Sequence, residues 1–203
     1  MLENDVLSKH IDPEKLGVYG LSAGGYTAMG LIGAVPDVER MQTHCTQYTE
    51  EYVCSEGMVD AVMRAGMDSL PDNDWGADSR IKAAAIAAPA FGFAYTSETL
   101  ANVSADIQFW SAGNDQSVPT DTNVTWLETQ LPVKPETHRI AQANHFASMV
   151  VPCRDTFKAA DPEEYEMVCG DAKGFDRREF HVQMHTEMIR FSNSSLIKAL
   201  HAG

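Results

Sequence analysis

The chain has 203 residues, of which 44% are hydrophobic and 22% charged, so it is long enough to build the core of one globular domain. It carries 29 Asp and Glu against 15 Lys and Arg, a formal net charge of −14. An acidic surface repels phosphate backbones and anionic membranes, which argues against nucleic acid as a partner. The most apolar stretch, 83–94, is too short to span a bilayer, and the polar start of the chain does not resemble a signal peptide.

In chain order, short apolar strands alternate with helices. The first half predicts a helix end at 2–10, a turn at 12–15, a strand at 16–20, a helix at about 23–34, an irregular, partly helical insertion at about 37–80, and a strand at 81–88. The second half predicts a short helix near 97–102, a strand at 107–110, a helix within 120–131, a strand at 137–140, a cysteine-bracketed excursion at 153–169, and a terminal amphipathic helix with Phe180, Met184, Met188 and Phe191 on its apolar face. This alternation predicts an α/β fold with about four mostly parallel strands flanked by helices, in a single domain over 1–203.

The strongest motif is Gly20-Leu21-Ser22-Ala23-Gly24, a G-x-S-x-G sequence between a predicted strand and a predicted helix. A nucleophile elbow requires this setting, because its sharp turn needs small neighbours and lifts the serine hydroxyl above the edge of the sheet. The free N–H groups of the following helix can stabilise an oxyanion. The motif predicts Ser22 as a nucleophile; the alternative is a glycine-rich turn with a structural serine.

A serine hydroxyl needs a base, and the base needs a carboxylate that orients it. In such sites the chain order is Ser, then Asp or Glu, then His. Asp115 follows the strand at 107–110 and His145 follows the strand at 137–140, so both fit this order. Asp121 is a weaker candidate because it lies farther from the strand end.

The other histidines have less support. His138 lies inside a predicted strand. His181 and His185 have the i, i+4 spacing of a helical metal pair, but no H-E-x-x-H pattern accompanies them. We therefore interpret these two as residues on the surface of the terminal helix and predict no metal site.

Four cysteines fall into two pairs that are close in sequence and lie in polar, loop-like segments. Disulfides Cys45–Cys54 and Cys153–Cys169 are possible, and they would favour a periplasmic or secreted location. The alternative is four reduced cysteines in a cytosolic protein.

Residues 18–28, VYGLSAGGYTA, resemble the elbow of bacterial dienelactone-hydrolase-like proteins, which are relatives of platelet-activating-factor acetylhydrolases. The elbow alone identifies only the α/β-hydrolase superfamily, and the cysteine-bracketed segment after His145 is more specific. Later segments fit the same group, namely 110–115 (WSAGND), 143–146 (ANHF) with Pro152-Cys153, and Cys169 with 175–177 (FDR).

The resemblance implies an α/β-hydrolase fold and cleavage of small-molecule or lipid carboxylic esters without a metal or organic cofactor. By position, Ser22 is the nucleophile, Asp115 the acid and His145 the base, and Ala23 gives one oxyanion-hole N–H. Asn144 stands where the family often has Gly. Dienelactone hydrolases proper use a Cys nucleophile, so Ser22 argues against that particular activity.

In this fold about half of the sheet, with the loop that supplies the second oxyanion N–H, precedes the elbow strand. Ser22 lies close to Met1, so the resemblance covers the C-terminal half of the domain and predicts a truncated gene model or a fragment. The elbow strand would then be an exposed apolar edge that a second chain could cover. Losing one oxyanion donor typically costs about 10² to 10³ in rate.

Three functions stay open. The first is a serine hydrolase that cleaves esters through an acyl-enzyme, either within a longer parent or with a partner. The second is a catalytically silent remnant of such an enzyme. The third is a serine peptidase of the prolyl-oligopeptidase type, which shares the elbow and the triad order; the paired cysteines weigh against it.

Overall fold

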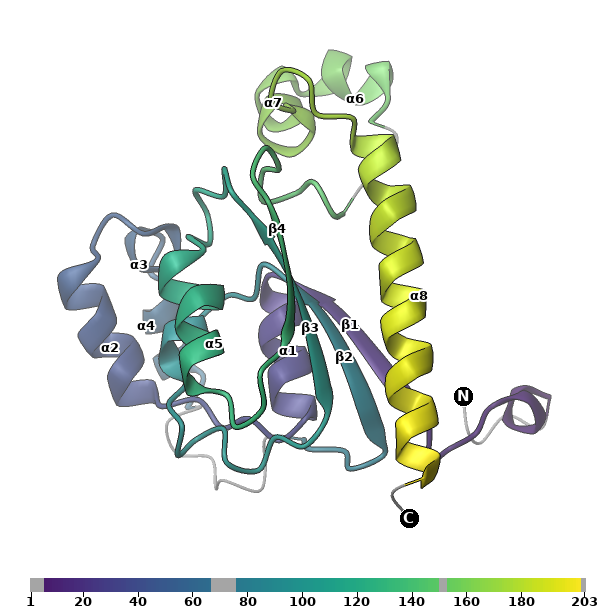
Figure 1. Ribbon diagram of the computed structural model, residues 1–203. Helices are drawn as coiled ribbons and strands as arrows, with labels where there is room; N and C mark the ends of the chain where they lie inside the picture. The colour runs from purple at the N-terminus through teal and green to yellow at the C-terminus, as the bar shows by residue number, and fades with distance from the viewer. Residues whose placement is uncertain (1–5, 67–75, 150–152, 202–203) are drawn as a thin grey trace.

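The computed structural model describes residues 6–66, 76–149 and 153–201 of the chain, and its centre is a four-stranded sheet (Figure 1). All three strand pairings are parallel, and the strands lie side by side in chain order. The strands are β1 (Leu16–Leu21), β2 (Ile81–Ala87), β3 (Asp106–Ala112) and β4 (Glu136–Ile140). The predicted fold class, α/β with four parallel strands flanked by helices, is confirmed.

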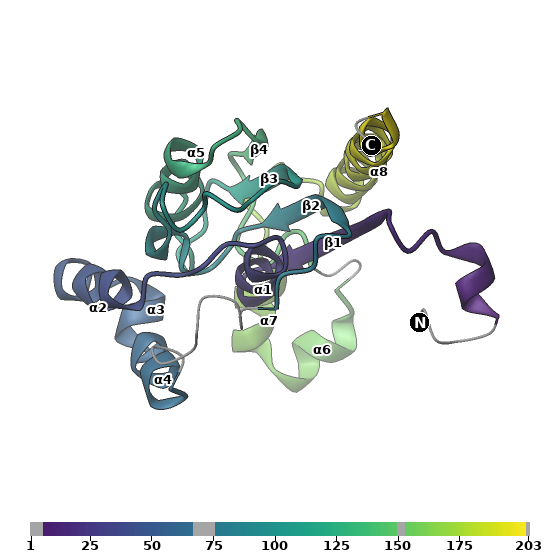
Figure 2. The same cartoon turned by 90° about the horizontal axis from the view of Figure 1, so that it is seen from below.

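Helices cover both faces of this sheet (Figures 1 and 2). α1 packs on β1 and β2, α5 belongs to the same core cluster, and α8 crosses the opposite face over β2. The described helical elements are η1 (Leu7–His10), α1 (Ala23–Leu31), α2 (Val38–Gln47), α3 (Tyr52–Ser55), α4 (Met58–Arg64), η3 (Gly92–Ala94), η4 (Asp121–Thr125), α5 (Trp126–Gln130), α6 (Asp155–Ala160), α7 (Pro162–Cys169) and α8 (Arg177–His201).

The hydrophobic core lies in two layers because β2 is buried on both faces. Ala84 and Ile86 face the α1 layer, and Ala87 faces the α8 layer. On α8, Phe180 and Met184 are buried one helical turn apart against the sheet. A run of apolar residues along one strand is typical of a parallel sheet covered by helices on both sides. The apolar face predicted for the terminal helix therefore belongs to the core.

The short helix predicted near 97–102 is wrong: these residues form turns, and the nearby helical element is η3. The Thr99 hydroxyl accepts a hydrogen bond from the Thr96 N–H at 2.9 Å and donates one to the Thr96 carbonyl at 3.2 Å. Such local bonds offer the backbone an alternative to the helix ladder. Residues 67–75 of the insertion predicted at about 37–80 lie outside the described residues, as does the start of the helix end predicted at 2–10.

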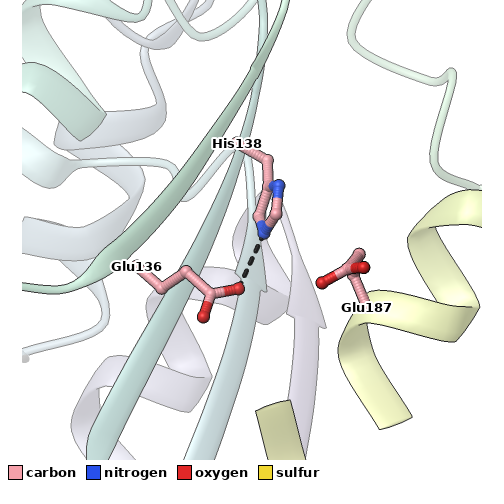
Figure 3. Close-up of side chains that lie close together, drawn as sticks. All are labelled: Glu136, His138 and Glu187. Atoms are coloured by element: carbon pink, nitrogen blue, oxygen red, sulfur yellow. Dashed lines mark hydrogen bonds and ion pairs between the residues drawn. The ribbon is translucent and has the colours of Figure 1, made fainter. Parts of the chain in front are cut away.

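A polar network joins β3 and β4 to α8, and three of its residues, Glu136, His138 and Glu187, are drawn in Figure 3. The Glu136 carboxylate accepts hydrogen bonds from Gln108 at 2.7 Å, His138 at 2.8 Å and Arg190 at 2.5 Å. Arg190 also donates to Glu187 at 2.6 Å. Burial opposes ionisation of Glu136, but the three donors outweigh it and lower the pKa of its carboxyl from 4.5 to about 2.

This network predicts acid-sensitive stability. Since the folded state lowers the pKa of Glu136, the stabilisation is fully present above the ordinary pKa and is lost as the pH falls towards about 2. Glu136→Gln should therefore lower Tm at about pH 6, and the difference from wild type should shrink steadily towards about pH 2.5. Glu98→Gln removes an exposed carboxylate and serves as the control. A Tm difference for Glu136→Gln that does not depend on pH would contradict this account.

Candidate active site

The carboxyl ends of the strands carry the three residues of the predicted triad. Ser22 follows β1 directly, Asp115 follows β3, and His145 follows β4. Because the strands are parallel, these ends meet at one edge of the sheet. Backbone hydrogen bonds tie the segments there, from Ser22 to Ala87 at 2.9 Å and from Asn114 to Ala143 at 2.9 Å.

Ser22 sits in a strained turn between β1 and α1. Its backbone has φ 56° and ψ −116°, a conformation that a residue with a side chain rarely adopts. The Ser22 carbonyl accepts hydrogen bonds from the N–H groups of Tyr26 at 3.0 Å and Ala90 at 3.1 Å, which hold the turn in place. A serine at a helix N-terminus usually caps the helix with its hydroxyl, but Ser22 makes no such bond to α1. Its hydroxyl is therefore not used by the helix.

Asp115 and His145 form a buried pair. The distance from Asp115 Oδ2 to His145 Nδ1 is 2.7 Å, and their side chains are 1% and 8% exposed. The other carboxylate oxygen accepts the N–H groups of Ser117 at 3.0 Å and Val118 at 2.7 Å. A carboxylate held in this way fixes the imidazole with its proton on Nδ1, which leaves the lone pair of Nε2 available as a base.

The hydroxyl of Ser22 and the ring of His145 are not hydrogen-bonded to each other in the described part of the chain. Catalytic hydrogen bonds are often long in a protein without substrate and tighten in the complex. The structure therefore brings Asp115 and His145 into contact, and it places Ser22 at the same edge of the sheet.

The N-terminus of α1 lies directly after Ser22. Ala23 is the first residue of this helix and is exposed, as is Gly24. The first N–H groups of any α-helix have no acceptor within the helix, and they carry partial positive charge. Ala23 thus offers a donor close to the serine, as an oxyanion would require.

A cleft of about 610 Å³ adjoins His145. One wall comes from Glu50 and from Tyr52 and Ser55 of α3, and another comes from α7 and the chain that follows it. Glu50, Glu166 and Asp171 are the acidic residues on its walls, and of these Asp171 is paired with Arg177.

Both predicted disulfides are present, and each lies in a segment that forms a wall of this cleft. Cys45–Cys54 joins α2 to α3, with Cα atoms 5.3 Å apart. Cys153–Cys169 closes the excursion after His145, with Cα atoms 6.1 Å apart. The disulfides thus restrain two segments that line the cleft beside His145, one that precedes it in the sequence and one that follows it.

Two other sequence candidates have different surroundings. His181 was expected on the surface of the terminal helix, which is wrong: it is 9% exposed, and its Nε2 lies 2.7 Å from the carbonyl of Ala147. Burial lowers the pKa of His181, which favours a neutral ring that donates this hydrogen bond. Asp121 begins η4 and lines a separate pocket with Arg40 and Trp126.

Glu136, His138 and Glu187 lie close enough to share one metal ion (Figure 3). Arg190 already donates to both carboxylates, and His138 donates to Glu136. The guanidinium therefore supplies the positive charge that an ion would bring, and we assign this cluster to the packing of α8.

None of the described helices has the length and apolarity needed to cross a membrane.

Two solved structures are similar to the chain. An acylaminoacyl peptidase from Pyrococcus horikoshii is 15% identical with a TM-score of 0.41, and the match covers 86% of this chain and 27% of the peptidase. The carboxylesterase Cest-2923 from Lactobacillus plantarum is 16% identical with a TM-score of 0.39, and the match covers 77% of this chain and 56% of the esterase. The chain thus spans about a quarter and about half of these two proteins. No protein-family model and no curated protein match the chain.

At these TM-scores, the assignment of the site rests on the chain's own residues. The sequence pointed to Ser22, Asp115 and His145 through a motif and an order along the chain. It did not point to Arg177 or His181 as partners of the His145 loop, because within that loop they bond to backbone carbonyls, which no pattern of side chains reveals.

The elbow generates a prediction with a matched control. A Cβ on Gly20 would lie 2.1 Å from the carbonyl oxygen of Gly24, whereas a Cβ on Gly24 would meet nothing within 4 Å. Gly20→Ala should therefore force the turn open, lower Tm and abolish any reaction at Ser22. Gly24→Ala should leave both nearly unchanged. Thermal unfolding and covalent labelling of Ser22 would check this, and equal effects of the two substitutions would refute it.

Proposed function

We propose that this protein is a serine hydrolase of the α/β-hydrolase class that cleaves carboxylic esters through an acyl-enzyme. The observation that carries the proposal is the strained Ser22, whose hydroxyl does not cap α1, at the same sheet edge as the buried Asp115–His145 pair. A serine held at positive φ costs conformational energy, and residues strained in this way cluster at active sites. The G-x-S-x-G sequence between a strand and a helix supports the same assignment.

The proposed reaction uses the three residues in their usual order. His145 Nε2 takes the proton of the Ser22 hydroxyl as its oxygen attacks the ester carbonyl, and Asp115 stabilises the imidazolium that forms. The Ala23 N–H stabilises the oxyanion. His145 then gives the proton to the leaving alcohol, and water hydrolyses the acyl-enzyme by the same steps. This mechanism requires neither a metal nor an organic cofactor.

The charge of the cleft bears on the substrate. Glu50 and Glu166 are exposed carboxylates on its walls, and the whole chain carries a net charge of −14. This field repels anionic substrates and favours neutral ones. We therefore propose small-molecule or lipid esters that carry no negative charge near the scissile bond.

The outer edge of β1 supports a further part of the proposal. β1 pairs with β2 on one side, and no other described strand pairs with it. Tyr19 on this strand is 44% exposed. A free strand edge is a template for another strand. We propose that a second polypeptide segment covers this edge and contributes the second oxyanion donor.

The two disulfides support a proposal about location. Because disulfides persist in oxidising compartments, we propose that the protein is periplasmic or secreted.

The first test is labelling of the purified chain with a fluorophosphonate. Wild type should be labelled at Ser22, while Ser22→Ala should not react and His145→Ala should react at least about 10³-fold more slowly, because the base activates the nucleophile. Intact-mass and peptide mass spectrometry would measure the site and the rate. Asp115→Asn should also slow labelling, because the amide no longer orients His145 as the carboxylate does. Asp121→Asn is its matched control and should label normally.

A folded wild-type chain that does not react would contradict the proposal for this chain and identify it as a silent remnant. Labelled protein that cleaves peptides but not esters would favour the peptidase alternative.

The second test concerns the cleft. Changing both Glu50 and Glu166 to Gln should raise kcat/KM for an anionic ester by roughly 2- to 10-fold and leave a neutral ester of equal acyl length nearly unchanged. The gain should shrink at high salt, because exposed charges are screened. Glu39→Gln with Glu98→Gln removes the same charge away from the cleft. An equal gain in this control would show that net charge, and not the cleft, decides the preference.

A further inference from the structure

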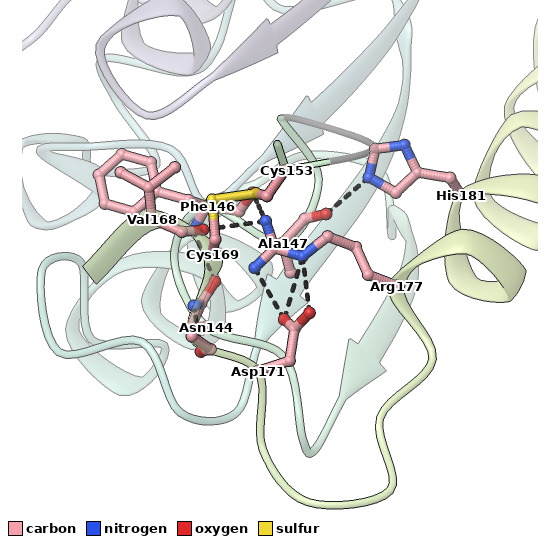
Figure 4. Close-up of a disulfide and its surroundings, with 10 residues drawn as sticks. Asn144, Phe146, Ala147, Cys153, Val168, Cys169, Asp171, Arg177 and His181 are labelled. Atoms are coloured by element: carbon pink, nitrogen blue, oxygen red, sulfur yellow. Dashed lines mark hydrogen bonds and ion pairs between the residues drawn. A yellow bond between two sulfur atoms is a disulfide. The ribbon is translucent and has the colours of Figure 1, made fainter. Parts of the chain in front are cut away.

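We propose that Arg177 is a positioning residue that holds the loop carrying His145 against the segment closed by the Cys153–Cys169 disulfide. The inference rests on the proposed function of His145 and adds to it the device that orients the base. Among the described residues, Arg177 bonds to Asp171, Val168 and Phe146, none of which belongs to the triad. It acts through the backbone of the loop, and its partners are shown in Figure 4.

Arg177 is the first residue of α8, and its side chain is 7% exposed. Its Nε lies 3.0 Å from both carboxylate oxygens of Asp171, and Nη2 lies 2.7 Å from one of them. Nη1 donates to the carbonyl of Val168 at 2.9 Å and to that of Phe146 at 3.5 Å. One guanidinium therefore links α8, the end of α7 and the residue that follows His145.

The backbone on both sides of His145 is held by further bonds to the same surroundings. Asn144 Nδ2 donates to the carbonyl of Gly170 at 2.9 Å, and Asn144 Oδ1 accepts the N–H of Phe146 at 3.0 Å. His181, one turn along α8 from Arg177, donates to the carbonyl of Ala147 at 2.7 Å. The residues before and after His145 are thus fixed to α8 and to the segment after α7.

The disulfide sits within this arrangement. Cys169 stands between Val168 and Gly170, whose carbonyls accept hydrogen bonds from Arg177 and Asn144. The bond to Cys153 joins this segment to the chain that leaves the His145 loop. The acceptors that anchor the loop are therefore cross-linked to it, which limits how far the two can separate.

Positioning explains this buried charge better than stability does. A buried ion pair commonly stabilises a fold no more than apolar side chains of the same size would. A guanidinium offers fixed donor directions in one plane, and a lysine at the same place cannot reach several acceptors in the same way. Arg190 provides the contrast on the same helix, because its side chain is 51% exposed and it bonds to the carboxylates of Glu136 and Glu187 instead of to the backbone of the His145 loop.

The experiment compares Arg177→Lys with the matched control Arg190→Lys in the full chain. We expect Arg177→Lys to slow fluorophosphonate labelling of Ser22 and to lower kcat for an ester by roughly 10- to 100-fold with little change in KM, since small misplacements of a catalytic group cost this much. The low-field NMR resonance of the proton between Asp115 and His145 should broaden or shift. Arg190→Lys should leave all three readouts unchanged.

Asp171→Asn should reproduce the effect more weakly, and Cys153→Ser with Cys169→Ser should also reproduce it. These variants decide the question if Arg177→Lys does not fold. A folded Arg177→Lys protein that labels at the wild-type rate and keeps the wild-type resonance would overturn the inference. If wild type itself does not label, the proposed function fails, and the resonance alone decides whether Arg177 positions His145.

Discussion

The parallel direction of four neighbouring strands is the constraint on which the site depends. Each strand end delivers its following residues to the same edge, so a serine, a carboxylate and an imidazole that are far apart in sequence share one surface. Between them stands β2, whose alanines let helices approach from both faces. The core therefore does more than stabilise the chain, because its packing sets the distances across which the three side chains must act.

Each of these side chains is restrained by a different physical means. The backbone of Ser22 is strained and is held by hydrogen bonds to its carbonyl. Asp115 is desolvated but receives two backbone N–H groups, which compensate the charge. His145 is oriented by Asp115 on one nitrogen and through its backbone neighbours by Arg177 and His181. Reactive groups in proteins commonly need such support from residues that never meet the substrate.

Patterns within the sequence predicted most of the fold and little of the support around the site. The first three strands followed from short runs rich in apolar residues, whereas the fourth, predicted at 137–140, has the largely polar sequence THRI. The elbow followed from Gly20 and Ser22 between a strand and a helix. The helix predicted near 97–102 is wrong because the hydroxyls of Thr96 and Thr99 form hydrogen bonds with nearby backbone groups. The spacing of apolar residues does not reveal such bonds. His181 was misplaced because its partner is a carbonyl distant in sequence. Contacts between side chains and remote backbone have no signature in one sequence.

The two disulfides have a consequence for how the chain oxidises. Four cysteines can pair in three ways. The pairing in this structure joins residues separated by 9 and 16 positions, whereas both alternatives would join the first half of the chain to the second. Closing a short loop costs less chain entropy than closing a long one. The pairing in this structure is therefore also the one that the unfolded chain reaches most readily, so the entropy of the chain itself favours it over the two alternatives.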